Sequence, residues 1–460
     1  MEPAHLRFGG GASETMMHPL VALWMLVAFV LILTIPRNKV IVPLLFTFFS
    51  VPIGQVVVLG GLHFTALRIL IIAGLIRRGK DASGGSSSPC KYPGGFNALD
   101  KVIVFWTIST LIVICLQWMN VQCTIAKLGE FLDSFGGFVV ARYFIPDWDA
   151  VRRTIKVLAV ICIVQGALMM NEQIMHQNLY GYLGGWPIAV TYRDGHVRSQ
   201  GVMGNIAGGL FGGTLIPLLL WLSTQAKSRS LGLLGIAGAA TMVFTSDAST
   251  SMMALNASVL GLMFWFLRRQ MRVIRWTLSL TLIGLQLVMN APVWSLIARI
   301  DLTGSSSGYH RYYLINNCVN HFSDWWLLGT KYYNTWGYDM FDLCDQYVVC
   351  AVTGGLVTLV LFIMIYSRSF GAIGRARKRV SGDRKQEWFL WCLGSTLFAH
   401  VVASFGLNYM ALLQMALFPL FAFVSVVAFE AKRLPAREAR TLHIPQVAAQ
   451  GYLPPLSEAR

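Results

Sequence analysis

Long apolar runs separated by short polar segments dominate the chain, and they predict membrane-spanning helices. A run of about 17–25 apolar residues is long enough to cross the hydrocarbon core of a bilayer as a helix. About thirteen runs approach this length, and because several are weak we expect about eleven to thirteen spans. Two weak runs are joined by only Leu59, Gly60 and Gly61 and could be re-entrant. The expected spans are 18–36, 40–58, 62–76, 101–119, 130–146, 154–172, 203–223, 232–246, 252–267, 276–290, 346–366, 388–405 and 407–429.

The composition excludes two other classes of protein. Of 460 residues, 55% are hydrophobic and only 13% are charged, which is too little charge to cover a soluble globule of this size. A disordered chain would be poor in aromatic residues, whereas this chain is 12% aromatic. We therefore expect an all-α polytopic transmembrane bundle, with residues 1–430 as a single membrane domain and 431–460 as a polar cytoplasmic tail. No clear cleavage site follows the first span, so we expect it to stay as an anchor.

The distribution of basic residues predicts the orientation. The chain carries 37 Lys and Arg against 21 Asp and Glu, a formal net charge of +16, and 29 of the 37 fall in segments that alternate between the expected spans. Cytoplasmic loops are enriched in Lys and Arg, so we expect the carboxyl tail inside, and the amino terminus and the long loops Gln173–Val202 and Ala291–Asp345 outside. Topology thus accounts for the charge, and we expect no nucleic-acid partner. The basic segments are 37–39, 77–101, 142–156, 227–229, 268–275, 368–385 and 432–460.

The first outer loop places two arginines before a glycine-rich span. Arg193 and Arg198 could bind a polyanion such as pyrophosphate, because guanidinium groups match phosphate oxygens. Arginines are few on this side of the membrane, which favours a functional role for Arg198. The glycines that follow could admit a ligand close to the backbone, but we favour tight helix packing as their role. They are Gly201, Gly204, Gly208, Gly209, Gly212 and Gly213.

The second outer loop combines acids, histidines and aromatic rings. Asp342 and Asp345 lie three residues apart just before a span, so either could cap the helix, and either could take a proton from an acceptor hydroxyl. Aromatic residues such as Trp336 beside acids suit a sugar site, although an interfacial aromatic belt would account for Trp325 and Trp326. The loop also holds His310, Arg311, His321 and Lys331.

Five further residues each have two interpretations. Cys318 and Cys344 could form a disulfide in an oxidising compartment, or could be small buried apolar residues. Arg68 could snorkel to the interface or hold a lipid phosphate. His400, near the end of a span, is a functional candidate by default or a satisfied packing residue. Asp247, between two spans, could cap a helix, which we favour, or bind a ligand. The cysteines and histidines show no metal-ligand spacing, and we expect no cofactor.

Four segments, in this order along the chain, resemble the O-antigen ligase and O-antigen polymerase superfamily. Residues 192–213 resemble the family pattern R-x-x-G-x-F-x-H-P-N-x-x-A, with Gly204-Asn205-Ile206 in place of His-Pro, and Ser246–Leu255 resembles a Thr/Ser-rich turn without its arginine. Residues 306–336 resemble S-x-x-R…hPl-x-G-x-G, and 342–362 resemble HN-x-Y/L…GL-x-G with Asp345-Gln346 in place of His-Asn. The resemblance spans about residues 60–430. The matching residues are Arg198, Gly201, Gly204, Asn205, Ala207, Arg311, His321, Gly329, Tyr347, Gly354 and Gly355.

The resemblance implies a fold of the membrane glycosyltransferase C type in the bacterial inner membrane, with a site that faces the periplasm. It implies transfer of glycan, with inversion and without a nucleotide sugar, from an undecaprenyl-pyrophosphate-linked oligosaccharide to a glycan or lipid acceptor. Carried over, Arg198 and Arg311 would bind the pyrophosphate. A loop histidine of the family's ligases is replaced here by Asp345, which favours a polymerase of O-antigen or exopolysaccharide over a ligase that builds lipopolysaccharide.

The expected site lies on the outer face of the membrane, and a transporter is the competing class of protein. We expect Asp345, His310 and Arg311 to be catalytic, with Asp345 or His310 as the base. Further partners would be the lipid bilayer and other proteins of envelope polysaccharide assembly. The competing class is a transporter or flippase, but transporters bury ionisable residues at mid-membrane, where the expected spans carry almost none. The residues expected to contact pyrophosphate or glycan are Arg193, Arg198, Asn205, Arg68, His321, Lys331, Trp336, Asp342 and His400.

Overall fold

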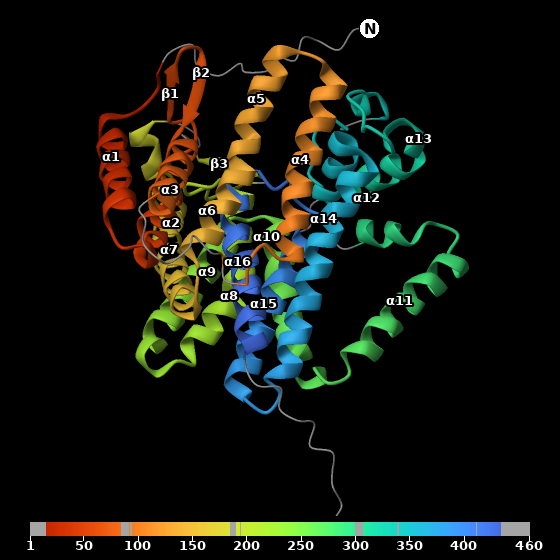
Figure 1. The fold of residues 1–460 in the computed structure, drawn as a ribbon. Coiled ribbons are helices and arrows are strands. Elements are labelled where there is room, and N and C mark those ends of the chain that lie inside the picture. The colour runs from red at the N-terminus through yellow and green to blue at the C-terminus, as the bar shows by residue number, and fades with distance from the viewer. Residues whose placement is uncertain are drawn as a thin grey trace, which may run out of the picture.

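A computed structural model places most of the chain in one helical bundle (Figure 1). It describes residues 15–83, 92, 94–184, 190–193, 195–299, 307–337, 340–410 and 412–433. Residues 434–460 of the expected polar tail therefore lie outside the described residues. The elements are α1 (Pro19–Thr34), α2 (Ile41–Phe48), β1 (Val56–Leu59), β2 (Leu62–Thr65), α3 (Ala66–Ser83), α4 (Ala98–Trp118), α5 (Val121–Phe131), α6 (Gly137–Phe144), α7 (Trp148–Met175), β3 (Thr191–Arg193), β4 (His196–Arg198), α8 (Asn205–Ser223), α9 (Arg229–Thr245), α10 (Ser249–Met263), α11 (Met271–Val288), α12 (Ser307–Asn320), α13 (Phe322–Trp325), α14 (Gln346–Arg379), α15 (Arg384–Ala403) and α16 (Leu412–Arg433).

Seven helices of the described residues are long and apolar enough to cross a membrane: α4, α7, α8, α10 with its extension to Leu267, α11, α14 and α16. This confirms a mostly helical, multi-pass membrane protein. Three other expected spans coincide with α1, α9 and α15, which are shorter or less apolar than these seven, whereas the expected span 62–76 begins as strand β2 and continues into α3. The expected span 130–146 is a helix interrupted by a π turn at Leu132–Gly136, between α5 and α6. A π turn inserts one residue into the helical repeat and often marks a local irregularity of packing.

The prediction of a span over 40–58 is wrong. Helix α2 ends at Phe48, and the chain then forms the antiparallel hairpin β1–β2, in which Val56 pairs with Thr65 and Leu59 with Leu62. Gly60 and Gly61 have φ angles of 58° and 78°, which suit a two-residue hairpin turn. The run of valines was apolar enough to resemble a span, but β-branched residues next to a glycine pair favour a strand.

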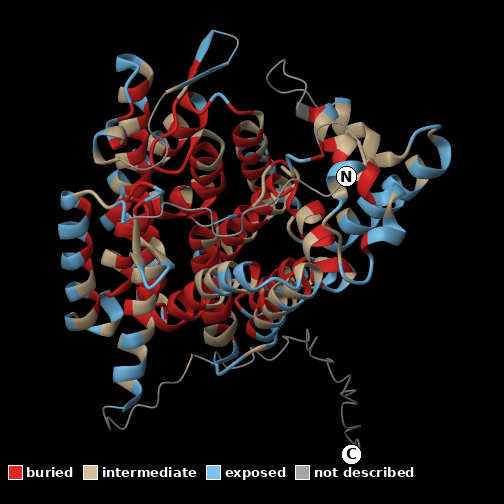
Figure 2. Cartoon of the chain, turned by 90° about the horizontal axis from the view of Figure 1, so that it is seen from above, coloured by how far each residue is buried: buried red, intermediate tan, exposed pale blue. Residues whose placement is uncertain are grey.

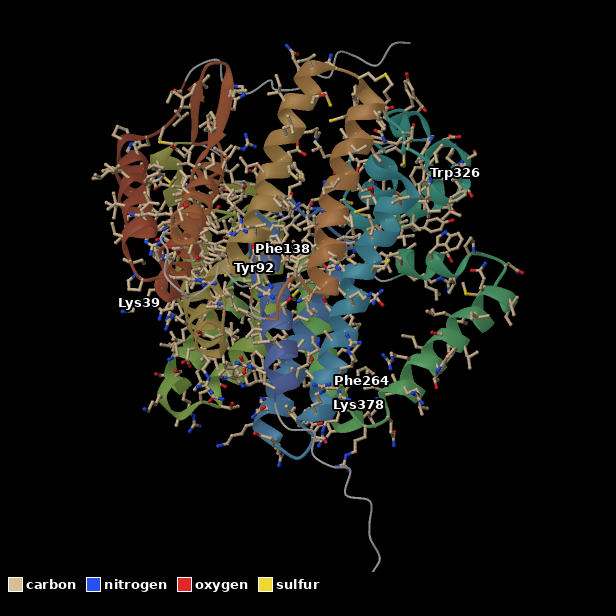
Figure 3. All side chains as sticks on the ribbon, viewed as in Figure 1. Lys39, Tyr92, Phe138, Phe264, Trp326 and Lys378 are labelled. Atoms are coloured by element: carbon tan, nitrogen blue, oxygen red, sulfur yellow. The ribbon has the colours of Figure 1, made fainter. Side chains whose placement is uncertain are left out.

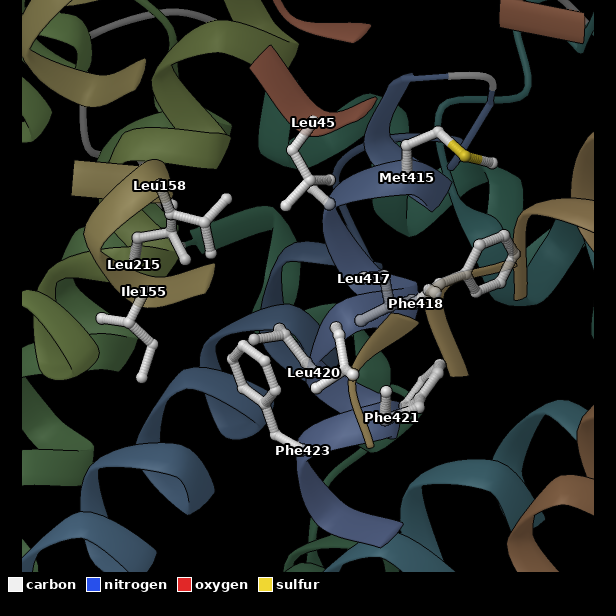
Figure 4. Packing of buried hydrophobic residues seen from close by; sticks show 14 of the residues in the cluster. Leu45, Ile155, Leu158, Leu215, Met415, Leu417, Phe418, Leu420, Phe421 and Phe423 are labelled. Carbon is white, nitrogen blue, oxygen red and sulfur yellow. The ribbon is translucent and has the colours of Figure 1, made fainter. Parts of the chain in front are cut away.

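The centre of the bundle depends on very close helix contacts. Viewed from above, buried residues gather in the middle and exposed ones at the rim (Figure 2). Helix α16 packs Leu417, Phe418 and Phe421 into this core (Figure 4). A Cβ on Gly166 of α7 would come within 2.5 Å of the carbonyl oxygen of Gly238 on α9, and one on Gly212 of α8 within 2.6 Å of Ala239 O. Small residues therefore let these helices touch backbone to backbone, the role expected for glycines of the α8 span.

Helix α11 differs from its neighbours because none of its residues is buried. It leans away from the bundle at the lower right of Figure 1. Its side chains Trp276, Leu280 and Leu287 are all exposed. A helix that is this apolar and this exposed requires a non-aqueous surrounding, which agrees with a lipid-embedded protein.

The glycine contacts predict a matched pair of substitutions. Gly238→Ala should lower the free energy of unfolding by about 1–3 kcal/mol, because the new methyl group would collide with the Cys162 backbone on α7. Gly284→Ala on α11 meets nothing within 4 Å and should be neutral or stabilising by up to about 1 kcal/mol. Thermal unfolding of the purified protein in detergent measures both. Equal losses in the two variants would contradict the α7–α9 contact.

Candidate functional site

The turn between α9 and α10 is the point at which distant segments meet; we call residues 246–251 the Ser246–Ser251 turn. Asp247 adopts a left-handed conformation with φ of 43°, which reverses the chain between the two helices. The turn packs on the first turns of α8, where Ser251 Oγ donates to Ile206 O at 3.4 Å. A Cβ on Gly209 would collide with the hydroxyls of Ser246 and Ser251. The glycine therefore allows α8 and the turn to touch.

Arg311 reaches this turn from α12. Its side chain is buried, and Nη2 donates to Ser249 Oγ at 3.1 Å and to Thr250 Oγ1 at 3.0 Å. Thr250 Oγ1 in turn donates to Gly406 O at 3.0 Å, in the segment between α15 and α16. Arg311 Nε is buried and has no hydrogen-bond partner among the described residues. Burial lowers the pKa of Arg311, while the nearby Cys344 and Asp345 raise it.

Arg198, which precedes the turn in the sequence, contacts the same turn. It ends strand β4 of the β3–β4 hairpin, and its Nε donates to Asp247 O at 3.1 Å. The next residue, Ser199, donates its backbone N–H to Thr245 O at 2.9 Å, which anchors the hairpin to α9. Burial lowers the pKa of Arg198, and the positive charge of Arg193 on β3 lowers it further, against the opposing effect of Asp247. Two expected pyrophosphate-binding arginines thus contact the same turn, Arg198 at Asp247 and Arg311 at Ser249 and Thr250.

Asp345 is both a helix cap and a strongly perturbed carboxyl group. Its Oδ1 accepts hydrogen bonds from the backbone N–H of Tyr347 at 2.8 Å and of Val348 at 3.1 Å, at the start of α14. Its Oδ2 is buried and has no partner among the described residues. Burial raises the pKa of Asp345 to about 7, against the opposing effects of the two N–H donors and of Arg311. The structure therefore confirms that Asp345 caps α14. Asp342 is exposed and does not cap this helix.

His310 and Asp342 lie beside a pocket next to this cap. The pocket has a volume of about 370 Å³, and its lining includes Asp342, Cys344 and Asn408. His310 Nε2 lies 3.1 Å from the carbonyl oxygen of Asp342. A carbonyl only accepts, so Nε2 carries the hydrogen in this contact, and Nδ1 of the neutral ring is an acceptor. Asp345 itself is buried and is not among the residues that line this pocket.

Three other expected ligands lie in the loop around α13 and do not contact the turn. His321 stacks on Trp336, with ring centroids 4.8 Å apart, and its Nδ1 lies 3.0 Å from Asn317 O. Lys331 lies over the rings of Trp118, at the end of α4, and Tyr332. These contacts stabilise the loop around α13.

Arg68 and His400 each have a partner within the protein. Arg68 makes a two-pronged ion pair with Asp133, with Nη2 and Oδ2 2.7 Å apart, and its Nη1 donates to His63 O. These partners already accept the hydrogen bonds that the guanidinium would donate to a lipid phosphate. His400 is buried, and its Nδ1 lies 2.8 Å from Tyr409 Oη, which is the satisfied packing interpretation. Asn205 begins α8 beside the turn and is half-buried.

The disulfide and cap alternatives are also decided by the structure. Cys318 and Cys344 are free thiols, and burial raises the pKa of each to about 12, so both are protonated and unreactive. Asp247 does not cap α10, whose cap residue is Ala248 with no side-chain hydrogen bond. Within the described ranges, no three His, Cys, Asp or Glu side chains are grouped to hold a metal ion.

One residue that positions the site is absent from the sequence-based expectations. Glu172, near the end of α7, is buried, and its Oε2 accepts from the backbone N–H of Gln200 at 3.0 Å and of Gly201 at 2.9 Å. The next residue, Gln173, accepts from Ser199 Oγ at 3.0 Å. These contacts hold the segment that carries Arg198. An acid inside an apolar helix is rare enough to be a functional candidate by itself, and that rule would have identified Glu172.

Comparisons with known proteins add no family assignment. No protein-family model matches the chain, and no curated protein matches it. The resemblance to the O-antigen ligase and polymerase superfamily therefore stays a prediction.

The perturbed carboxyl group predicts a pH dependence of stability. Because the folded-state pKa of Asp345, about 7, lies above its ordinary value of 3.8, the folded protein retains the proton longer than the unfolded chain does. This contribution to stability is complete below about pH 4 and is lost as the pH rises through about 7. Asp345→Asn keeps a capping side chain but removes the titration. As the pH rises from about 5 to about 8, the melting temperature of the wild type should fall relative to that of Asp345→Asn.

Thermal unfolding of both proteins at the two pH values measures this difference. Asp383→Asn, at the exposed cap of α15, is the matched control for loss of a capping carboxylate. A constant offset between wild type and Asp345→Asn at both pH values would contradict the assignment.

Proposed function

We propose that this protein is a membrane glycosyltransferase that takes glycan from a lipid-pyrophosphate-linked donor, with an O-antigen or exopolysaccharide polymerase as the preferred activity. The observation that carries the proposal is the convergence of Arg198 and Arg311 on Asp247 and on Ser249 and Thr250. Two partly or fully buried guanidinium groups on one turn provide the charge that a pyrophosphate requires. The resemblance in the same four segments supports the same substrate class.

The proposed roles follow from the atoms that lack partners. Arg311 Nε, buried without an acceptor, would donate to a pyrophosphate oxygen, and Arg198 would stabilise the negative charge from the hairpin side. An acceptor hydroxyl would attack the anomeric carbon of the donor sugar, and the bond from that carbon to the pyrophosphate oxygen would break. The leaving undecaprenyl pyrophosphate would retain the electron pair.

The acceptor proton would pass to a base near the α14 cap. Asp345 Oδ2 has no partner, and its pKa of about 7 suits proton transfer near neutral pH. Because Asp345 is buried and is not among the residues that line the pocket beside Asp342, this role requires that pocket to open toward Oδ2. His310, whose Nδ1 is the acceptor of its neutral ring, is the second candidate base. A ligase would use the same groups on a lipid acceptor.

The arginine pair predicts a loss of product affinity. Purified protein in lipid nanodiscs is titrated with undecaprenyl pyrophosphate, the leaving group common to every donor of this class. Arg311→Gln and Arg198→Gln should each weaken binding roughly ten- to hundredfold, because each removes a charge-assisted hydrogen bond. Lys127→Gln is the control, since it removes one positive charge from an exposed pair with Glu130 and not from the turn.

A turnover assay then separates enzyme from transporter. In proteoliposomes with a labelled lipid-linked oligosaccharide, chain elongation with release of undecaprenyl pyrophosphate supports the proposed function. Movement of the labelled lipid between leaflets without a new glycosidic bond would instead identify a flippase. Unchanged binding in both arginine variants would remove the Ser246–Ser251 turn from the site.

A further inference from the structure

A second cavity lies between α1 and α2, on a different part of the bundle from the Ser246–Ser251 turn; we call it the α1–α2 groove. Its volume is about 520 Å³, and its walls are mostly apolar, with Val27 and Leu31 of α1 facing Val42 and Phe46 of α2. From Trp24 to Ile35 the α1 wall extends about 16 Å, at the usual rise of a helix. The groove therefore has the dimensions of part of an extended hydrocarbon chain.

Two basic residues stand at one end of the groove. Lys39 follows α1 in the turn before α2, and Arg153 belongs to the first turns of α7. Figure 3 shows Lys39 at the left edge of the bundle, below α1. Arg153 Nη1 donates to Asn38 O, which fixes the guanidinium beside the turn that carries Lys39. The apolar walls and the cationic end thus form one continuous cavity.

The charges at this end are available to a ligand. The nearby Arg37 is already engaged, because it donates to Tyr143 O and its guanidinium lies 3.9 Å from the centre of the Tyr143 ring. Lys39 is exposed, and within the described residues neither Lys39 nor Arg153 forms an ion pair with an acid. Asp149, one turn before Arg153 on α7, is among the acids that form no such pair. Two cations without a counter-charge favour an anionic occupant.

The wall of the groove also contains a buried polar atom to which no described residue forms a hydrogen bond. Thr47, near the end of α2, is fully buried and lines the groove, and its Oγ1 has no hydrogen-bond partner among the described residues. An unsatisfied hydroxyl in an apolar wall costs free energy unless a ligand atom accepts its hydrogen. The rings of Trp24 and Phe46, 6.1 Å apart and edge to face, line the same groove.

We infer that the α1–α2 groove binds one anionic glycerophospholipid, with an acyl chain along the apolar walls and its phosphate between Lys39 and Arg153. An anionic headgroup satisfies both cations, whereas a choline headgroup would bring a third positive charge to the same end. This lipid site is independent of the proposed enzymatic function.

Native mass spectrometry of the full-length protein tests the site with phosphatidylglycerol and phosphatidylcholine as probes. The wild type should retain phosphatidylglycerol in preference to phosphatidylcholine. The double variant Lys39→Gln/Arg153→Gln should weaken phosphatidylglycerol binding about thirtyfold, since each basic residue near an anionic lipid contributes roughly a factor of five. The matched control is Arg152→Gln/Lys156→Gln, which removes two exposed charges from the same helix α7 outside the groove.

A second variant tests the apolar half of the site. Val27→Trp fills the groove and leaves both cations in place, so it should also lose the retained phosphatidylglycerol, while thermal unfolding verifies that each variant is folded. Three results would overturn the inference: equal retention of the two lipids by the wild type, equal losses in the control and the groove variants, or displacement of phosphatidylglycerol by equimolar undecaprenyl phosphate. The last result would assign the groove to an isoprenoid lipid.

Discussion

The contact of the Ser246–Ser251 turn with the start of α8 is the constraint on which the proposed site depends. Gly209 has no side chain, so the hydroxyls of Ser246 and Ser251 can occupy the space that a Cβ would fill. This close approach sets the position of the turn beneath the β3–β4 hairpin and beside α12. Because Arg198 and Arg311 bond to backbone and side-chain groups of that turn, a shift of the turn would move both arginines.

Burial then decides the chemistry of the groups gathered there. Arg311 and Asp345 influence each other electrostatically but form no ion pair, and each retains one buried polar atom without a partner. A folded protein tolerates such atoms at a cost in stability. The same cost is recovered when a ligand supplies the missing partner, and for this reason we place the proposed pyrophosphate and proton-transfer steps at these atoms.

Local sequence predicted parts of this arrangement and misjudged others. The scarcity of arginines on the non-basic side drew attention to Arg198, and the spacing before α14 left Asp342 and Asp345 as alternative caps, of which the structure shows Asp345. Arg68 was also a candidate for binding phosphate, but Asp133, 65 residues away along the chain, pairs with it through folding. The partners of Arg311, Ser249 and Thr250, belong to the Thr/Ser-rich turn that the resemblance pointed to, but only the structure joins that turn to Arg311.

The amino-acid sequence by itself determined the class of this protein: apolar runs of membrane length, few charges and basic residues in alternate loops require helices in a bilayer, because lipid leaves backbone groups no other partner. Only the tertiary structure decided which polar residues meet. Hydrogen bonds between residues 49 to 62 positions apart, such as those of Arg198 with Asp247 and of Arg311 with Ser249, depend on helix packing. That packing is set by contacts such as Gly166 against Gly238, and no local periodicity encodes the distance between two such elements.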